Sequence, residues 1–192
     1  MAAVTAFLAS RNRNKLEELR TGLRGWRLEP VAAADWPPET GRTYEENARA
    51  KARFARSLAP ADAWALGEDS GIECEALGGE PGLHSARWAA GRDEADALLE
   101  RLAGEPDRRA RMVSELVALG PAGEELHARG VLEGAVATGR RGTGGFGYDP
   151  VFIPAGHDRT VAELGDAWKR VHSHRALAAS ALLEAIRSAG AS

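Results

Sequence analysis

The sequence is poor in cysteine and in long apolar runs, and each shortage excludes a class of protein. Its one cysteine, Cys74, permits no internal disulfide and no multi-thiolate metal cluster, so we expect a cytoplasmic protein in which Cys74 is a packing residue. No stretch reaches the roughly 20 apolar residues of a membrane-spanning helix. The short apolar run 4–9 comes before the nearby positive charges, the reverse of a secretory signal. We therefore expect no membrane partner.

The sequence also lacks an excess of positive charge. It has 25 lysines and arginines against 28 aspartates and glutamates, a formal net charge of −3. Proteins that track along DNA or RNA are usually basic, so we expect no nucleic-acid partner and a phosphate ligand bound only locally. With 192 residues, 44% of them hydrophobic, the chain is long enough to bury the core of one globular domain.

The hydrophobic pattern predicts a mixture of strands and helices without an interdomain linker. We expect one strand that begins at residue 64 and ends at the segment 68–71. We expect further strands over 4–9, 72–77, 111–119, 126–137 and 151–153. We expect helices after the loop at 10–15, over 43–59 and 93–102, and at the end of the sequence. The turn at 120–123 is short enough to join antiparallel neighbours, which predicts a mixed sheet.

The loop Ser10–Lys15 lies where a strand leads into a helix. Backbone N–H groups at a helix start, side-chain amides and an ammonium could converge there on a phosphate. A plain polar helix start with solvated arginines is the alternative.

Glu68 and Asp69 follow an apolar strand and precede the small pair Ser70-Gly71. Carboxylates in this position suit Mg²⁺, and a solvated turn is the alternative. Glu39 and Glu46 could supply further carboxylates.

The run Gly142–Gly147 matches the dinucleotide-binding pattern GxGxxG, but that pattern must open a helix. Here Pro150 follows and favours extended backbone. The loop either presents Phe146 and Tyr148 to a flat ligand or packs these aromatics in the core.

The segment 169–175 concentrates positive and hydrogen-bonding groups before the last helix. Its two histidines do not predict zinc, because no thiol is near and the flanking cations oppose a divalent ion. Contacts to a nucleotide base or phosphate are one interpretation, and a solvated basic helix start is the other.

Together these segments resemble the inosine triphosphate pyrophosphatase family, also called dITP/XTP pyrophosphatases, over nearly the whole chain. The motifs that carry the resemblance are Thr43-Tyr44-Glu45-Glu46-Asn47-Ala48, Asp69-Ser70-Gly71, Leu77-Gly78-Gly79-Glu80-Pro81-Gly82, Ser85-Ala86-Arg87, Gly144-Gly145-Phe146-Gly147-Tyr148-Asp149-Pro150 and Ser173-His174-Arg175. The resemblance implies an α/β fold with a long mixed central β-sheet and flanking helices. It also implies that residues 1–192 form one domain with two lobes and an active-site cleft between them.

The resemblance further implies a homodimer that hydrolyses deaminated purine nucleoside triphosphates (ITP, dITP and XTP) to the monophosphate and pyrophosphate, with Mg²⁺ as cofactor. By position, Asp69 would be the general base and a metal ligand, with Glu68 and Glu39 as further ligands, and Ser70 would touch the substrate. The triphosphate would be held by Ser10, Arg11, Asn12, Arg13, Asn14, Lys15 and Lys169. The base and sugar would be enclosed by Phe146, Gly147, Tyr148, Asp149, His174 and Arg175.

The chain departs from the family pattern at several of these positions. Glu68 stands where the family has aspartate, and Arg11 and Asn14 replace glycines of the phosphate loop. Pro38 replaces the carboxylate that precedes Glu39. A pyrophosphatase of other modified nucleotides is an alternative function, and a nucleotide- or RNA-binding module without catalysis is another.

Overall fold

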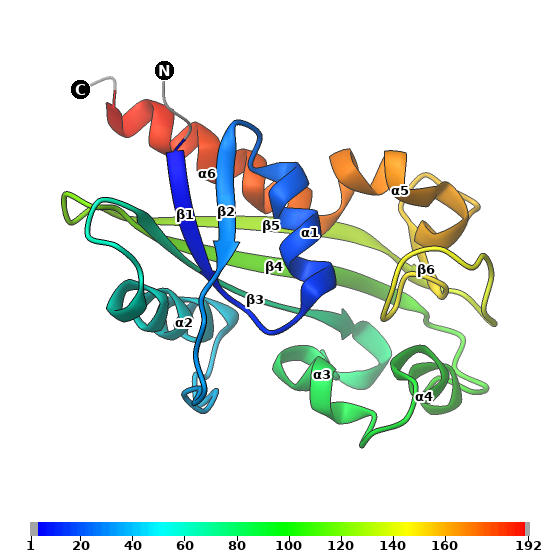
Figure 1. The fold of residues 1–192 in the computed structure, drawn as a ribbon. Helices are drawn as coiled ribbons and strands as arrows, with labels where there is room; N and C mark the ends of the chain where they lie inside the picture. Colours follow the sequence, from blue (N-terminus) through cyan, green and yellow to red (C-terminus); the bar gives the residue numbers. More distant parts are fainter. Residues whose placement is uncertain (1–3, 191–192) are drawn as a thin grey trace. The chain divides into compact units, whose positions relative to one another are not determined.

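The structure is a computed structural model that describes residues 4–190. Its first elements are strand β1 (Val4–Ala9), helix α1 (Arg13–Gly22) and strand β2 (Trp26–Pro30). Helix α2 (Tyr44–Leu58) follows, and strand β3 (Trp64–Cys74) leads to helices α3 (Ser85–Trp88) and α4 (Glu94–Arg101). The remaining elements are strands β4 (Arg109–Leu119), β5 (Glu125–Val136) and β6 (Phe152–Pro154), and helices α5 (Val161–His172) and α6 (His174–Gly190). The strands and helices alternate along much of the chain (Figure 1).

The six strands form one sheet in the order β2-β1-β3-β4-β5-β6. Strand β1 pairs in parallel with both β2 and β3, whereas β5 and β6 are antiparallel. The register places Leu8 opposite Leu66, so these two leucines lie on the same face of the sheet. The expected α/β fold with a mixed sheet and flanking helices is confirmed.

Strand β3 differs from the prediction, which ended one strand at 68–71 and began another at 72. The structure has a single strand of 11 residues. The alternation continues through the small residues, because Ile72 and Cys74 are both buried in the core. Cys74 is therefore a packing residue as expected, and burial raises the pKa of its thiol to about 12.

Strand β2 and helix α5 were not predicted. Helix α5 is interrupted at Gly165, whose φ of 80° breaks the helical periodicity. The basic segment 169–175, which we expected before the last helix, lies across the end of α5 and the start of α6.

The described residues divide into two compact units. The first takes its members from Met1–Asp69, Ser114–Gly130 and Arg175–Ser192, and the second from Ser70–Val113 and Val131–His174. In the first unit α1 and α6 pack on one face of the strands, where Leu19 and Leu182 join Leu66. Helix α2 covers the other face through Ala52, which packs against Val117, and Figure 1 shows α2 and α6 on opposite sides of the strands.

The second unit has its own core. Leu98 of α4 packs there with Ile72, Tyr148, Phe152 and Val161. Within residues 4–190, no helix combines the length and the apolar composition needed to cross a bilayer.

Candidate active site

Glu68 occupies a buried position on β3, where three other elements supply its partners. Its carboxylate accepts hydrogen bonds from Lys15 Nζ of α1 at 2.9 Å, Arg175 Nε of α6 at 3.0 Å and Ser114 Oγ of β4 at 3.2 Å. Arg175 also bonds Glu18 through Nη1 at 3.1 Å. One buried carboxylate therefore holds a lysine and an arginine from opposite ends of the chain.

Asp69 is the next residue of β3, but its partners come from α2. Asn47 Nδ2 donates to Oδ2 at 3.0 Å, and Lys51 Nζ donates to Oδ1 at 2.8 Å. Lys51 Nζ also lies 2.6 Å from Glu39 Oε1. Successive side chains of a strand point to opposite faces, which explains why the carboxylates of Glu68 and Asp69 enter different environments.

Gly67 allows α2 to approach β3 closely enough for these contacts. A Cβ at position 67 would lie 2.0 Å from the Ala48 carbonyl oxygen and 2.4 Å from the Ala52 nitrogen. Both are helix backbone atoms, so any side chain here would force the helix away from the strand. The glycine thereby brings Asn47 and Lys51, one helical turn apart, to the same carboxylate.

The pKa shifts of Glu68 and of the two nearby lysines follow from these contacts. Burial raises the pKa of Glu68, but the nearby charges of Lys15, Arg175 and Lys51 outweigh it and hold the pKa well below its usual range. Burial lowers the pKa of Lys51, but Asp69 and Glu68 outweigh it and the net shift is upward. Burial also lowers the pKa of Lys15. The attraction of Glu68 raises it by less, so the net shift of the Lys15 pKa is downward. Glu68 is therefore ionised at neutral pH.

The loop Ser10–Lys15 leads from β1 into α1, as predicted. Asn12 is the N-cap of α1, and its Oδ1 accepts from the backbone N–H groups of Asn14 at 2.9 Å and Lys15 at 3.2 Å. The Arg11 guanidinium lies 5.6 Å from the centre of the Trp36 ring. Except for Ser10 and Lys15, the loop residues are exposed, so they are accessible to a ligand.

A second group of predicted residues lies in the other unit, around Asp149. Its Oδ2 accepts from Phe146 N at 2.8 Å and from Lys169 Nζ at 2.5 Å. The same ammonium lies 4.1 Å from the centre of the Phe146 ring, within the range of a cation–π interaction. Asp149 and Lys169 are both buried, so their ion pair fixes the loop that carries Phe146.

The aromatic residues of this loop have different environments. Tyr148 is buried, belongs to the core of its unit and donates its hydroxyl to the Ser85 carbonyl at 3.2 Å. Burial raises the pKa of this phenol. Phe146 is only half-buried, and Gly147 has a φ of 60° in the turn between them. The core interpretation therefore holds for Tyr148, whereas Phe146 keeps an accessible ring surface.

The predicted site residues are divided between the units. The first unit contains Ser10–Lys15, Glu39, Glu68, Asp69 and Arg175, and the second contains Ser70, Phe146–Asp149, Lys169 and His174. Within the first, Glu68 is joined to Lys15 and Arg175, and Lys51 joins Asp69 to Glu39.

The three predicted metal ligands do not form a cluster. Across residues 4–190, no three His, Cys, Asp or Glu side chains are grouped so that they could hold a metal ion. Glu68 pairs with Lys15 and Arg175, whereas the carboxylates of Glu39 and Asp69 both contact Lys51 Nζ. Sequence reasoning missed Lys51 and gave no role to Asn47. Their i, i+4 spacing on one helix was the available signal.

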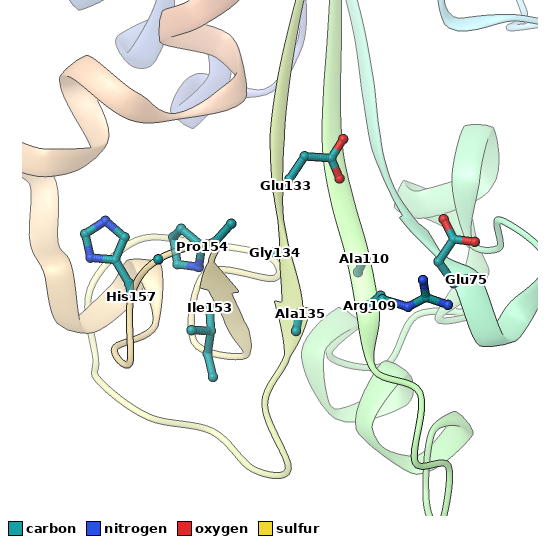
Figure 2. Close-up of a pocket in the computed structure, with 11 residues that line it drawn as sticks. Glu75, Arg109, Ala110, Glu133, Gly134, Ala135, Ile153, Pro154 and His157 are labelled. Atoms are coloured by element: carbon teal, nitrogen blue, oxygen red, sulfur yellow. The ribbon is translucent and has the colours of Figure 1, made fainter.

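A cavity of about 450 Å³ lies elsewhere in the second unit (Figure 2). Glu75, Arg109, Glu133 and His157 contribute its charged and polar side chains. Its described lining residues include none of the predicted site residues.

The fold and the buried ionic groups define an α/β protein with a polar site built on the middle of strand β3. Residues 6–185 match the sequence model of the Ham1 family, and the chain belongs to this family, which confirms the resemblance noted from the motifs. The dITP/XTP pyrophosphatase of Symbiobacterium thermophilum is 48% identical over 191 residues, which cover 96% of this chain and 95% of the relative.

Solved structures agree with this assignment. The Ham1 protein of Staphylococcus aureus is 34% identical with a TM-score of 0.82, covering 97% of this chain and 99% of its own. The nucleoside-triphosphatase / dITP/XTP pyrophosphatase of Mycobacterium abscessus is 37% identical with a TM-score of 0.71, covering 96% and 100%.

Proposed function

We propose that this protein hydrolyses dITP, ITP and XTP to the nucleoside monophosphate and pyrophosphate, which clears deaminated purines from the nucleotide pool. The observation that carries the proposal is the buried Asp69 carboxylate, held by Asn47 and Lys51 beside Glu39 in a Ham1 chain. Relatives with nearly half of their residues identical are named dITP/XTP pyrophosphatases, and they align over almost their full length.

Asp69 would act as the general base. Cleavage between the α and β phosphates requires a water directed at the α-phosphorus and a group that accepts its proton. Asp69 has the chemistry for this step, because its carboxylate is oriented by two donors from one helix. Lys51 would lie beside the phosphates as a fixed positive charge and offset the charge that develops on them.

Magnesium dependence fits the donors of this site. Two carboxylates, from Glu39 and Asp69, contact the same Lys51 Nζ, so their oxygens converge on one small region. Mg²⁺ is typically held by one or two carboxylates together with substrate phosphates. When bound, Mg²⁺ would neutralise charge on the phosphate oxygens. Glu68 is occupied by Lys15 and Arg175, so its proposed task is to fix these two cations.

The remaining predicted residues would bind the nucleotide. The loop Ser10–Lys15 and Lys169 would hold the triphosphate, and Ser70 would contact it. The accessible ring of Phe146 would stack on the base, with Gly147, Tyr148 and Asp149 shaping its loop. His174 and Arg175 would select the purine 6-carbonyl. Because arginine only donates hydrogen bonds, it favours a carbonyl acceptor over the amino group of adenine.

Further proposals concern the whole protein. We infer a cytoplasmic homodimer without a nucleic-acid partner, formed by one two-lobed domain over residues 1–192. The single cysteine and the net charge of −3 support the location and the lack of a nucleic-acid partner. The family resemblance supports the dimer.

An assay of five nucleotides tests the function. Purified protein is incubated with ITP, dITP, XTP, ATP and GTP, with and without Mg²⁺, and pyrophosphate and orthophosphate are measured separately. We expect pyrophosphate from the first three, in the presence of Mg²⁺ only. Orthophosphate as the sole product would contradict cleavage between the α and β phosphates. Equal rates with ATP would contradict the preference for deaminated purines.

A further inference from the structure

Asn47 uses both ends of its side-chain amide. Its Nδ2 donates to Asp69 Oδ2 at 3.0 Å, and its Oδ1 accepts from the Gly41 backbone N–H at 2.8 Å. The side chain is buried, with 4% of the residue exposed. A single amide thus connects strand β3 to the segment that precedes α2.

The contact with Asp69 matters because an aspartate carboxylate has little orientation preference of its own. The terminal torsion of such a side chain is broad, so neighbouring groups must fix the plane of the carboxylate. Asn47 holds one oxygen of Asp69 and Lys51 holds the other, at 3.0 and 2.8 Å. With Asn47 removed, Lys51 alone would hold the group, and the carboxylate could rotate about that single contact.

The contact with Gly41 fixes the position of Glu39. A Cβ at position 41 would lie 2.5 Å from Asn47 Oδ1 and 2.9 Å from the Asn47 backbone nitrogen, so the segment lies tightly against the start of α2. Glu39 is two residues earlier and contacts Lys51. Asn47 therefore controls the orientation of Asp69 and the location of the neighbouring carboxylate together.

We propose that Asn47 is a positioning residue for the reaction, orienting the Asp69 carboxylate and setting its spacing from Glu39. This inference rests on the proposed function of Asp69 and adds the group that makes Asp69 effective. Groups that orient a metal-binding or catalytic side chain typically contribute about 10- to 100-fold to activity or metal affinity. The effect falls on the chemical step, because no predicted nucleotide contact involves Asn47.

Two substitutions separate the contacts of Asn47. Asn47→Ala removes both. Asn47→Asp keeps an oxygen that accepts from Gly41 N–H, but at pH 8 it has no donor for Asp69 and places a second negative charge beside it. A merely structural tether to Gly41 would be retained by Asn47→Asp, whereas an orienting role would not.

Thr43→Ala is the matched control. Thr43 is the N-cap of α2, and its hydroxyl oxygen accepts a hydrogen bond from the Glu46 backbone N–H at 3.1 Å. Loss of such a cap destabilises the helix but leaves the Asn47 contacts in place. Any effect of a merely weakened α2 appears in this variant as well.

The measurement is kcat and KM for pyrophosphate release from ITP at saturating Mg²⁺. We expect both Asn47 variants to lose about 10- to 100-fold in kcat with KM changed by less than about threefold, and Thr43→Ala to keep kcat within about twofold. Full kcat in Asn47→Asp, or an equal loss in Thr43→Ala, would overturn the positioning role. A wild-type protein that releases no pyrophosphate would instead overturn the proposed function.

A second measurement tests the contact without any turnover. In ¹H–¹⁵N spectra, the side-chain amide signals of Asn47 are identified by their loss in Asn47→Asp. We expect Asp69→Asn to shift these signals and Thr43→Ala to leave them in place. Unmoved signals in Asp69→Asn would show that the two side chains do not interact.

Discussion

Glu68 and Asp69 are consecutive carboxylates on one strand, and their surroundings differ in kind. Glu68 is held by Lys15 and Arg175, from two helices on one face of the sheet, and by Ser114 of the neighbouring strand β4. Asp69 is held by two side chains of a single helix on the other face and shares Lys51 with the exposed Glu39. This difference indicates that Glu68 is suited to holding elements of the fold together, whereas Asp69 is suited to binding a ligand.

The largest expected effect is the loss of activity in Asp69→Asn. Without the proposed base, we expect kcat for pyrophosphate release to fall on the order of 1000-fold. Its stability should change less than that of Glu68→Gln, because Asp69 forms an ion pair with Lys51, whereas Glu68 forms ion pairs with both Lys15 and Arg175. Steady-state kinetics and urea unfolding measure the two quantities. An unchanged kcat would show that Asp69 is not the general base, and it would contradict the proposed difference in role between Glu68 and Asp69.

Glu68→Gln should affect stability more than kcat, because Glu68 fixes Lys15 and Arg175 and has no proposed part in the chemical step. The substitution leaves Lys15 and Arg175 without their shared negative partner, and breaking a buried ion pair costs about 3 kcal/mol or more. We expect the free energy of unfolding to fall by about this amount. Glu17→Gln is the control, because the exposed Glu17–Arg20 pair on α1 contributes less than about 1 kcal/mol. Equal stability of Glu68→Gln and Glu17→Gln would show that the buried ion pairs of Glu68 do not stabilise the fold.

Gly67→Ala tests the close approach of α2 that brings the Asp69 group together. The added methyl meets backbone atoms of the helix, and we expect a loss of about 2 kcal/mol in unfolding free energy together with reduced kcat. A Cβ at Gly139 meets nothing within 4 Å, so Gly139→Ala is the control. Wild-type behaviour of Gly67→Ala would mean that α2 need not touch the strand.

The smallest effect is the acid sensitivity that Glu68 confers. Its pKa lies below the ordinary value of 4.5 in the folded protein, so the unfolded state binds the proton more readily. The stabilisation from the Glu68 carboxylate is complete above pH 4.5. It declines by about 1.4 kcal/mol per pH unit as the pH falls towards the pKa of the folded protein. Urea unfolding at several pH values should show the stability gap between wild type and Glu68→Gln narrowing below about pH 4.5. A constant gap would contradict the shift.

Much of the fold could be predicted because burial follows the periodicity of the sequence. The Val4–Ala9 strand and the helix that follows Thr43 have the predicted positions. Helix α5 was missed, since Gly165 interrupts the helical pattern.

The candidate site was less predictable than the fold. Adjacency in sequence suggested that Glu68 and Asp69 share a ligand, but strand alternation separates them. The roles of Asn47 and Lys51 depend on how closely α2 approaches β3. Gly67 permits that approach, and a lone glycine in a strand does not reveal which backbone it will meet.

The lysine between Glu39 and Asp69 also bears on how the site behaves before any ligand arrives. Two carboxylates brought together repel each other, and the ammonium of Lys51 offsets that repulsion as the chain folds. The pair is therefore preorganised: folding has already fixed its spacing. An incoming cation meets acids that need little rearrangement, although it must compete with a positive charge that the chain carries itself.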